Sequence, residues 1–231
     1  ESAPANAIGV VFYAGNPQPS VTHPEKYTID KDPLRRVCRE CKHGLVLALN
    51  NGKIKGTDEN ETLVETARFS TANKLYYGTW FRADEDYKDA YVDMERQKVA
   101  PTAGSQGYNN TVLMEVGANR TDDSKKASGN ALEALDYYRS AVSVPTVSTK
   151  WFFPSDYDLI TLHDVVTKVN TSIGNTNGTQ LVINDGDTKK GTFYWSNTER
   201  NNEWMWGNTM GSGNDTYSPS GSGSLTAKRY D

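Results

Sequence analysis

One amphipathic segment, residues 155–174, constrains the fold more than any other part of the chain. Its apolar side chains recur with the period of a helix and form one stripe, made of Leu159, Leu162, Val165, Val166 and Val169. Ser155 stands where an N-cap is expected, and Asp156 and Asp158 suit the positive end of a helix dipole. The segment therefore predicts a helix that packs on a core and ends near Gly174.

Strand-like blocks surround this helix in the sequence. Residues 193–196 predict a strand, with its partner at residues 203–207. Apolar runs at residues 8–14 and 44–50 predict two more strands that are able to pair with each other. A second helix is predicted over residues 131–142, where apolar residues again lie near helical spacing. Strands towards both ends and helices between them predict an α+β fold, with the two termini near each other in one sheet.

Weaker patterns predict the connections. Residues 15–41 contain four prolines and predict a loop, and residues 107–111 predict a turn before the short apolar run 112–114. Residues 207–224 predict a loop of Gly, Ser and Asn. Strands are also expected at 63–69 and 225–230.

The domain organisation expected from these patterns is simple. Residues 1–7 are interpreted as a flexible lead-in, and residues 8–231 as a single domain. Residues 53–105 fit the pattern least well and are interpreted as an insertion within it. The start at Glu1, without a signal peptide, indicates a mature terminus or a piece of a longer protein.

Charge and composition argue against a nucleic-acid partner and against a transmembrane segment. The net charge is −4, and no run of Lys and Arg interleaved with aromatic residues occurs, so a nucleic-acid partner is not expected. No run of about 18 apolar residues occurs, so no transmembrane segment is expected. The abundance of Tyr, Asn, Thr, Ser and Gly is typical of secreted and cell-surface proteins, and an extracellular or outer-membrane surface location is therefore expected.

The residues needed for catalysis or for a metal are sparse. The chain has three histidines, without His-x-x-x-His spacing, and it has no Gly-x-Ser-x-Gly elbow. His163 is expected to have a structural role at the edge of the helix stripe. The closely spaced acids of residues 184–187 resemble part of a calcium loop, but an ordinary turn is favoured. A protein without enzymatic activity and without a cofactor is expected, with calcium left open.

The two cysteines form a Cys-x-x-Cys motif at Cys38 and Cys41. One such motif cannot supply the four ligands of a structural zinc site. Neighbouring Arg and Lys residues would lower a thiol pKa, which leaves reactivity open. A local disulfide, or two free thiols in a loop, is favoured over redox or metal function.

Aromatic, amide and acidic residues gather near the C-terminus. Aromatic faces stack on sugar rings, amides and carboxylates bind hydroxyl groups, and Tyr and Asn are common in adaptable binding surfaces. The predicted ligand-binding residues are Asn197, Glu199, Asn201, Asn202, Trp204, Trp206, Asn208, Asn214, Asp215 and Tyr217. The alternative is that the strand tryptophans belong to the core, because alternate side chains of a strand point inward. On that interpretation the loop after Glu199 is the better binding candidate.

The order of several motifs resembles a known family. Gly-Tyr-Asn-Asn-Thr at residues 107–111 resembles a Gly-x-x-Asn-Thr segment, Trp-Phe-Phe-Pro-Ser at 151–155 resembles Trp-Tyr-Leu-Pro-Ser, and Tyr-Trp-Ser-Asn-Thr-Glu at 194–199 resembles Tyr-Trp-Ser-Ser-Thr-Glu. The runs at 9–13 and 43–49 resemble an opening hairpin. Together they are similar to the C-type lectin-like domains of bacterial surface proteins, such as the fimbrillin-associated proteins of Bacteroidales and the collagen-like adhesin of Legionella.

The resemblance implies a C-type lectin-like fold, with two helices packed on antiparallel sheets and with long loops. It implies a non-enzymatic adhesin-type domain that binds an extracellular glycan or protein. There are two alternatives. One is an assembly module at the tip of a fimbria, in contact with other fimbrial or surface subunits. The other is a variable receptor-binding protein diversified by a retroelement. The calcium signatures Glu-Pro-Asn and Trp-Asn-Asp of sugar-binding members are absent from the sequence.

Overall fold

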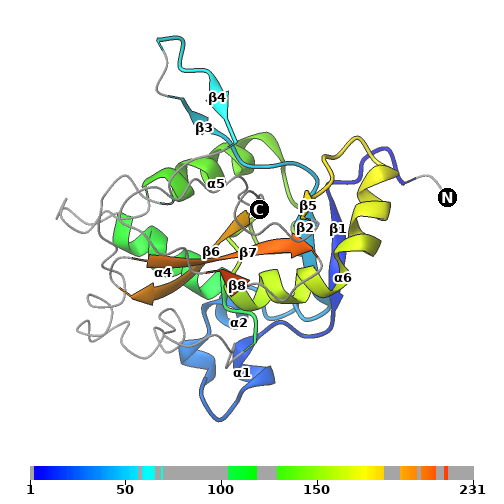
Figure 1. Ribbon diagram of the computed structural model, residues 1–231. Coiled ribbons are helices and arrows are strands. Elements are labelled where there is room, and N and C mark those ends of the chain that lie inside the picture. Colours follow the sequence, from blue (N-terminus) through cyan, green and yellow to red (C-terminus); the bar gives the residue numbers. More distant parts are fainter. Residues whose placement is uncertain are drawn as a thin grey trace.

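The computed structural model describes residues 3–56, 59–65, 69, 104–118, 129–184, 193–201, 204–211 and 216–217. The described strands are β1 (Gly9–Ala14), β2 (Gly44–Ala48), β3 (Ile54–Lys55), β4 (Leu63–Val64), β5 (Ile183–Asn184), β6 (Phe193–Asn201), β7 (Trp204–Gly211) and β8 (Thr216–Tyr217). The described helices are α1 (Pro19–Thr22), the short 3₁₀ helix η1 (Ile29–Lys31), α2 (Pro33–Val37), α4 (Gly107–Ala118), α5 (Gly129–Ala141) and α6 (Asp156–Gly174). Small sheets and helices together form the expected α+β architecture (Figure 1).

A sheet built on the hairpin β6–β7 crosses the middle of the molecule (Figure 1). Strands β6 and β7 pair antiparallel, and β8 and β5 pair with β7. Because successive side chains of a strand point to opposite faces, the sheet separates two cores. Trp195 and Met205 lie in the core formed with α4 and α5, whereas Tyr194 and Met210 lie in the core formed with α6. The pair β5–β7 is parallel, so the prediction of antiparallel sheets holds only for the other pairs.

Helix α6 confirms the prediction made from the amphipathic segment. Its buried stripe consists of Leu159, Leu162, Val166, Val169 and Ile173, and Val165 packs beside it. The Ser155 hydroxyl accepts a hydrogen bond from the backbone N–H of Asp158, and the Asp158 carboxylate accepts one from the backbone N–H of Ser155. This reciprocal capping box satisfies two N–H groups that the helix start would otherwise leave unpaired.

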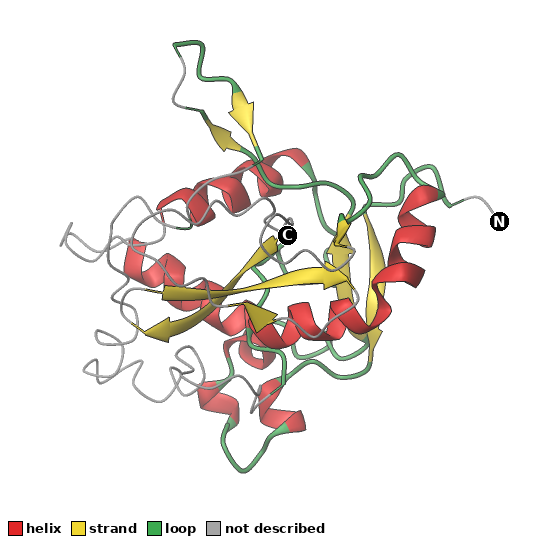
Figure 2. Cartoon of the chain, viewed as in Figure 1, coloured by secondary structure: helices red, strands yellow, loops and turns green. Residues whose placement is uncertain are grey.

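A separate sheet of two strands, β1 and β2, packs against α6 (Figure 2). The strands pair antiparallel, with Val10 opposite Leu47 and Val11 opposite Val46, as the two apolar runs predicted. Leu47 points into the core beside α6 and is 4% exposed. The opposite face carries Val11 and Val46, and it matters for the site described below.

Helix α4 contradicts the prediction of a turn at residues 107–111. The backbone N–H of Gly107 donates to the Asp158 carboxylate, and the Thr111 hydroxyl donates back to the carbonyl of Gly107. Leu113 and Met114 on the next turn are fully buried. These contacts with the rest of the fold outweigh the low helix propensity of Gly and Asn. Within the described residues, α4 is thus a third long helix beside α6 and α5, and α5 confirms the second predicted helix.

Short helices replace the loop predicted over residues 15–41. Pro19 and Pro33 are the first residues of α1 and α2, where the missing N–H of proline costs no hydrogen bond. Asp32 caps α2 by accepting from the backbone N–H of Arg35. Two of the four prolines thus begin helices, whereas the sequence analysis assigned all four to a loop.

The remaining predictions have mixed outcomes. Residues 207–211 and 216–217, which were predicted to lie in a loop, belong to the strands β7 and β8. The described part of the strand predicted at 63–69 contains β4, which pairs with β3 in a hairpin that projects from the body (Figure 1). Ala7, in the predicted lead-in, packs against the core beside α6. Most of the interpreted insertion, the acids at 185–187 and the strand at 225–230 lie outside the described residues. Within the described part, no helix is long and apolar enough to cross a membrane.

Candidate functional site

An apolar groove of about 450 Å³ lies against the outer face of the sheet β1–β2. The groove is lined by Gly9 and Val11 from β1, by Gly44 and Val46 from β2, and by the segment from Val144 to Phe152. The loop from Glu40 to His43 supplies a further part of its rim. A volume of this size is in the range of ligand-binding clefts, which is about 300–1,000 Å³.

The floor of the groove is aliphatic, although the open face of such a sheet is usually polar. A small antiparallel sheet that is covered on one face normally alternates apolar and polar residues. Here Val11 and Val46 are cross-strand partners on the open face, and they are 62% and 45% exposed. With Val147 of the wall, which is 77% exposed, they form an uncovered aliphatic surface. Contiguous apolar surface of this kind marks interaction sites.

The wall formed by residues 144–152 is held firmly to the body of the protein. Ser148 closes a turn by donating from its backbone N–H to the carbonyl of Pro145 over 3.0 Å. The Trp151 indole N–H donates to the carbonyl of Val142, and its ring meets that of Tyr138 edge to face at 5.3 Å. Arg139 donates to the carbonyl of Trp151 over 2.7 Å. The groove is therefore formed before any partner arrives.

A disulfide between Cys38 and Cys41 braces the rim loop. Of the alternatives that the sequence left open, the local disulfide is the one that the structure contains. The sulfur atoms of Cys38 and Cys41 lie 3.8 and 3.7 Å from the carbonyl oxygen of Val147, so the disulfide touches the opposite wall. The buried Gln18 amide donates to the carbonyls of residues 38, 39 and 41. Within the described residues, no cluster of three or more metal-ligating side chains occurs.

Charged groups line the rim but not the floor. Glu40 and Lys42 form an exposed ion pair at 2.9 Å, and the hydrogen bond and charge of Lys42 lower the pKa of Glu40. Of this pair only Glu40 lines the groove, together with His43 and Lys150. The surface thus combines an aliphatic floor with an ionic margin.

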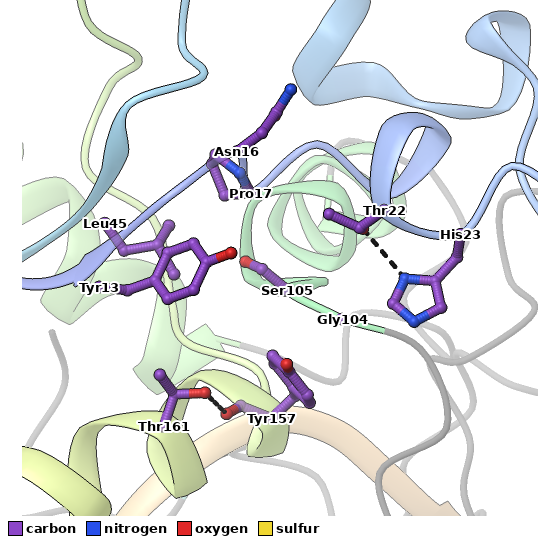
Figure 3. Close-up of a pocket in the computed structure, with 10 residues that line it drawn as sticks. All are labelled: Tyr13, Asn16, Pro17, Thr22, His23, Leu45, Gly104, Ser105, Tyr157 and Thr161. Carbon is purple, nitrogen blue, oxygen red and sulfur yellow. Dashed lines mark hydrogen bonds between the residues drawn. The ribbon is translucent and has the colours of Figure 1, made fainter.

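A second hollow of about 30 Å³ lies nearby, and Pro17 and Leu45 line both (Figure 3). Tyr13 and Ser105 point towards each other across it, and His23 makes a hydrogen bond with Thr22. That volume accommodates about one water molecule. It is too small for a sugar ring or a peptide side chain, so the groove is the better candidate site.

Four of the predicted ligand-binding residues lie in the protein interior. Asn197 and Glu199 are fully buried, and Trp206 and Asn208 are 3% and 2% exposed. They sit on β6 and β7, whose two faces are both covered by helices. These four residues are therefore placed in the packing of the fold and not on an open surface, in agreement with the alternative that the strand tryptophans belong to the core.

For the other six predicted residues, the structure describes the backbone of three and leaves out the other three. Asn201, Trp204 and Tyr217 belong to the strands β6, β7 and β8, and their side chains are outside the description. Asn202, Asn214 and Asp215 lie outside the described residues. Ligand binding by this part of the set stays a prediction.

The side chain of Asn197 is bonded to other parts of the fold in the interior. Its side-chain amide donates to the carbonyls of Gly107 and Phe153 over 2.9 and 2.8 Å and approaches the Thr111 hydroxyl at 3.2 Å. Its side-chain oxygen accepts from the Asn110 amide at 3.2 Å. One side chain on β6 thereby joins the start of α4 to the segment before α6. Three sequence motifs that are far apart in the chain meet at this residue.

The same network buries two carboxylates. One Asp158 oxygen accepts from the N–H and hydroxyl of Ser155 and from the N–H of Gly107, while the other has no partner among the described residues. Complete burial raises the pKa of Asp158. A Cβ at Gly107 would lie 2.5 Å from this carboxylate, so only glycine fits there. Asp156 accepts from the Thr198 hydroxyl over 3.0 Å.

His163 also has the structural role that was expected. Its Nε2 atom lies 2.7 Å from the carbonyl oxygen of Gly211, at the end of β7. The side chain thus links α6 to the central sheet.

Sequence reasoning missed the groove, although a signal was present. The runs at β1 and β2 are apolar at successive positions, including Val10 and Val11 in one strand and Leu45 and Val46 in the other. Such runs place apolar side chains on both faces of a sheet. In a two-stranded sheet with one face on the core, the second apolar face is either covered by another part of the chain or open to a partner.

Comparisons with known proteins point to fimbriae. The chain is 30% identical over 217 residues to the "Putative fimbrium tip subunit Fim1C" of Bacteroides ovatus, an alignment that covers 89% of this chain and 36% of that protein. A crystal structure of a fimbrial protein from Bacteroides ovatus is similar with a TM-score of 0.68 and 28% identity, over 90% of this chain and 40% of that one.

The chain is homologous to part of a fimbrial protein. It spans about a third of the length of its curated relative. No protein-family model matches the chain. The expected similarity to Bacteroidales fimbria-associated proteins is confirmed, whereas the C-type lectin-like fold stays a prediction.

Proposed function

We propose that this chain is a non-enzymatic binding module of a fimbrial protein at the bacterial cell surface, and that its apolar groove holds another fimbrial subunit. The observation that carries the proposal is the preformed groove on a domain that is homologous, over nearly its whole length, to a protein named as a fimbrium tip subunit. A fimbria is an assembly of protein subunits, and each contact in it needs a complementary surface on the two partners. The aliphatic face of β1–β2 has the properties of such a surface.

A protein partner is favoured over a glycan by the chemistry of the groove. Sugar rings need exposed aromatic faces and several amide or carboxylate groups for their hydroxyls. The indole of Trp151 is 9% exposed, and the valines that dominate the floor offer no hydrogen bonds. Four of the residues predicted to bind a glycan or protein ligand are interior. Aliphatic side chains of a protein are the better match.

The C-type lectin-like arrangement is proposed as the scaffold of this module. Support comes from the buried network, in which Gly107, Thr111, Phe153 and Asn197 join motifs that resemble those of the family. We propose no calcium or other cofactor for the module. The scaffold serves to hold the sheet β1–β2 and the wall at 144–152 in a fixed relation.

The proposal is tested by replacing one valine in the groove and one outside it. Val46 and Val182 are 45% and 44% exposed, and only Val46 lines the groove. Val46→Asp places a charge on the aliphatic floor, while Val182→Asp places the same charge on an ordinary surface. Each variant is introduced into the gene that encodes the chain, and fimbriae are purified and labelled with an antibody to the domain.

We expect label on fimbriae from the parent and from Val182→Asp cells, and little label with Val46→Asp, although the variant protein is still made and folded. Fimbriae that carry no label in parent cells would contradict the fimbrial role. Equal label with all three proteins would show that the groove is not the contact with other subunits.

A further inference from the structure

We propose that Asn177 is a site of spontaneous deamidation, at which the side-chain amide becomes a carboxylate and part of the molecules acquire an isoaspartate in the backbone. The chain contains two Asn–Gly dipeptides, at residues 51–52 and 177–178. The two share the same local chemistry, but the fold places them in opposite surroundings. The difference between these surroundings predicts that Asn177 reacts in the folded protein and that Asn51 is protected.

The reaction needs the chain itself and water. The backbone nitrogen of Gly178 forms a bond to the Cγ atom of Asn177, and the C–N bond of the side-chain amide breaks, so that ammonia leaves with the proton of the Gly178 N–H. Water then opens the cyclic imide at either carbonyl, which gives aspartate or isoaspartate. Glycine after the asparagine favours ring closure, because it has no side chain to obstruct its own nitrogen and its backbone is free to turn.

The surroundings of Asn177 leave the reacting atoms accessible. Asn177 lies in the turn that follows α6, where its side chain is exposed and makes no hydrogen bond to another described residue. A Cβ at residue 178 would lie 2.8 Å from the carbonyl oxygen of Leu49, so the close approach of this turn to Leu49 requires glycine there. The packing of the fold thus requires the residue that makes Asn177 reactive.

The surroundings of Asn51 prevent the same reaction. Asn51 is 3% exposed, and its side-chain amide donates a hydrogen bond to the carboxylate of Glu65. Gly52 is buried against α5, where a Cβ would lie 2.8 Å from the carbonyl oxygen of Ala134. Ring closure requires the asparagine side chain to turn towards the next nitrogen, so residue 51 first has to leave these contacts. The reaction then depends on local opening, whose free energy lowers the rate.

One hydrogen bond slows the reaction at Asn177. The backbone N–H of Gly178 donates to the Thr176 hydroxyl over 2.9 Å, and this hydroxyl donates to the carbonyl of Ile173 over 2.7 Å. The attack requires the nitrogen of Gly178 to turn towards Asn177, which breaks its bond to Thr176. The rate at Asn177 in the folded protein should therefore lie between the rate in the unfolded chain and the rate at Asn51.

The products weaken the attachment of the turn to the end of β2. The backbone N–H of Thr179 donates to the carbonyl of Leu49 over 2.8 Å, and the Thr179 hydroxyl donates to the Asn50 side chain over 3.2 Å. Isoaspartate lengthens the backbone just before these contacts. Either product also adds a negative charge near the C-terminus of α6, where the helix dipole is negative. Both effects favour release of Thr179 from Leu49.

Ageing of the intact protein tests the proposal. Freshly purified protein is incubated at mildly alkaline pH, with and without urea, and is then digested with trypsin. Tandem mass spectrometry of the fragments 43–53 and 169–189 gives the extent of deamidation at Asn51 and at Asn177. The Thr176→Val and Asn177→Ala variants are treated in parallel, and the rate at Asn51 reports whether each variant is still folded.

We expect Asn177 to deamidate at least about tenfold faster than Asn51 in the folded protein, and the two to react at similar rates in urea. Thr176→Val should raise the rate at Asn177 and leave the rate at Asn51 unchanged. Hydrogen exchange at the amide of Thr179 should be faster in aged than in fresh parent protein. Ageing should leave this exchange unchanged in Asn177→Ala.

Three results would overturn parts of this account. Equal rates at Asn51 and Asn177 in the folded protein, or an Asn177 that stays intact, would refute the site. A rate in Thr176→Val equal to that of the parent would show that the bond to Thr176 does not slow the reaction. Unchanged exchange at Thr179 after deamidation would show that the turn stays attached to β2.

Discussion

Removal of the Asn197 side chain tests whether this residue holds the fold together or binds a ligand. The side-chain amide donates hydrogen bonds to the carbonyls of Gly107 and Phe153, and the side-chain oxygen accepts one from the Asn110 amide. In Asn197→Ala each of these groups loses one hydrogen bond, and bulk water does not replace it because residue 197 is fully buried. We therefore expect a large loss of stability.

The magnitude follows from the number of buried groups that lose a hydrogen bond. Each buried polar group without a partner costs about 1–3 kcal/mol, and two carbonyls and one amide are affected. The Thr111 hydroxyl can still donate to the Gly107 carbonyl over 2.8 Å or to the Phe153 carbonyl over 3.3 Å, and the Asn110 amide can still donate to the backbone carbonyl of residue 197 over 3.4 Å. These contacts offset part of the loss. The expected decrease in the free energy of unfolding is about 3–5 kcal/mol. For a chain of 231 residues this lowers Tm by about 10–15 °C.

The measurement is thermal and urea unfolding followed by circular dichroism, with two matched variants. Asn177→Ala, at an exposed position in the turn after α6, should change Tm little. Asn197→Asp keeps the shape but turns the donor into a carboxylate that faces two carbonyl oxygens. It should be at least as destabilising at neutral pH and should recover in part at acidic pH, where the protonated carboxyl can donate. An unchanged Tm for Asn197→Ala, combined with a loss of partner binding, would refute the structural role and restore the ligand-binding prediction.

Other substitutions test the capping box, the core and the disulfide. Burial raises the folded pKa of Asp158 above the reference value of 3.8, so the carboxyl contributes stability that is full below pH 3.8 and is lost as the pH rises through the folded pKa. Asp158→Asn, whose amide oxygen can keep the three accepted hydrogen bonds, should flatten this part of the pH profile of urea midpoints; an unchanged profile would contradict it. Trp206→Ala should lower stability by about 3–5 kcal/mol and leave the labelling of fimbriae intact below Tm, and the reverse pattern would place Trp206 in a binding site. Replacement of Cys38 and Cys41 by serine should lower stability by about 2 kcal/mol, by the loop-closure argument for a four-residue loop. It should also speed amide hydrogen exchange around Val147 but not in α5; unchanged exchange there would show that the disulfide does not brace the wall.

Local patterns predicted the helices α5 and α6 well. The stripe from Leu159 to Val169 and the cap at Ser155 define α6 without help from the rest of the chain, because helical periodicity and capping are short-range effects. The strands β1, β2, β6 and β7 were likewise located, since each is a run of apolar and aromatic residues. Helix α4 was missed because its start depends on the Asp158 carboxylate, which lies 51 residues further along the chain.

The sequence located the strands that carry the predicted site residues but did not show whether those residues are buried. Residues 197–208 carry amide, acidic and aromatic groups, and such groups either bind ligands or satisfy one another inside the protein. Composition does not separate these outcomes, because burial depends on which elements cover the strand. The helices α4 and α5 cover one face of β6–β7 and α6 covers the other, which places Asn197 and Trp206 inside.

The sequence by itself determined where the main helices and strands lie and that the class is α+β. It also set the positions of the two valine-bearing strands and of the two cysteines. The tertiary structure decided which apolar face stays open: α6 covers the face of β1–β2 that carries Leu47 and leaves Val11 and Val46 uncovered. The physical reason is that alternation assigns side chains to two faces of a strand, whereas only the packing of distant elements decides which of those faces is removed from water.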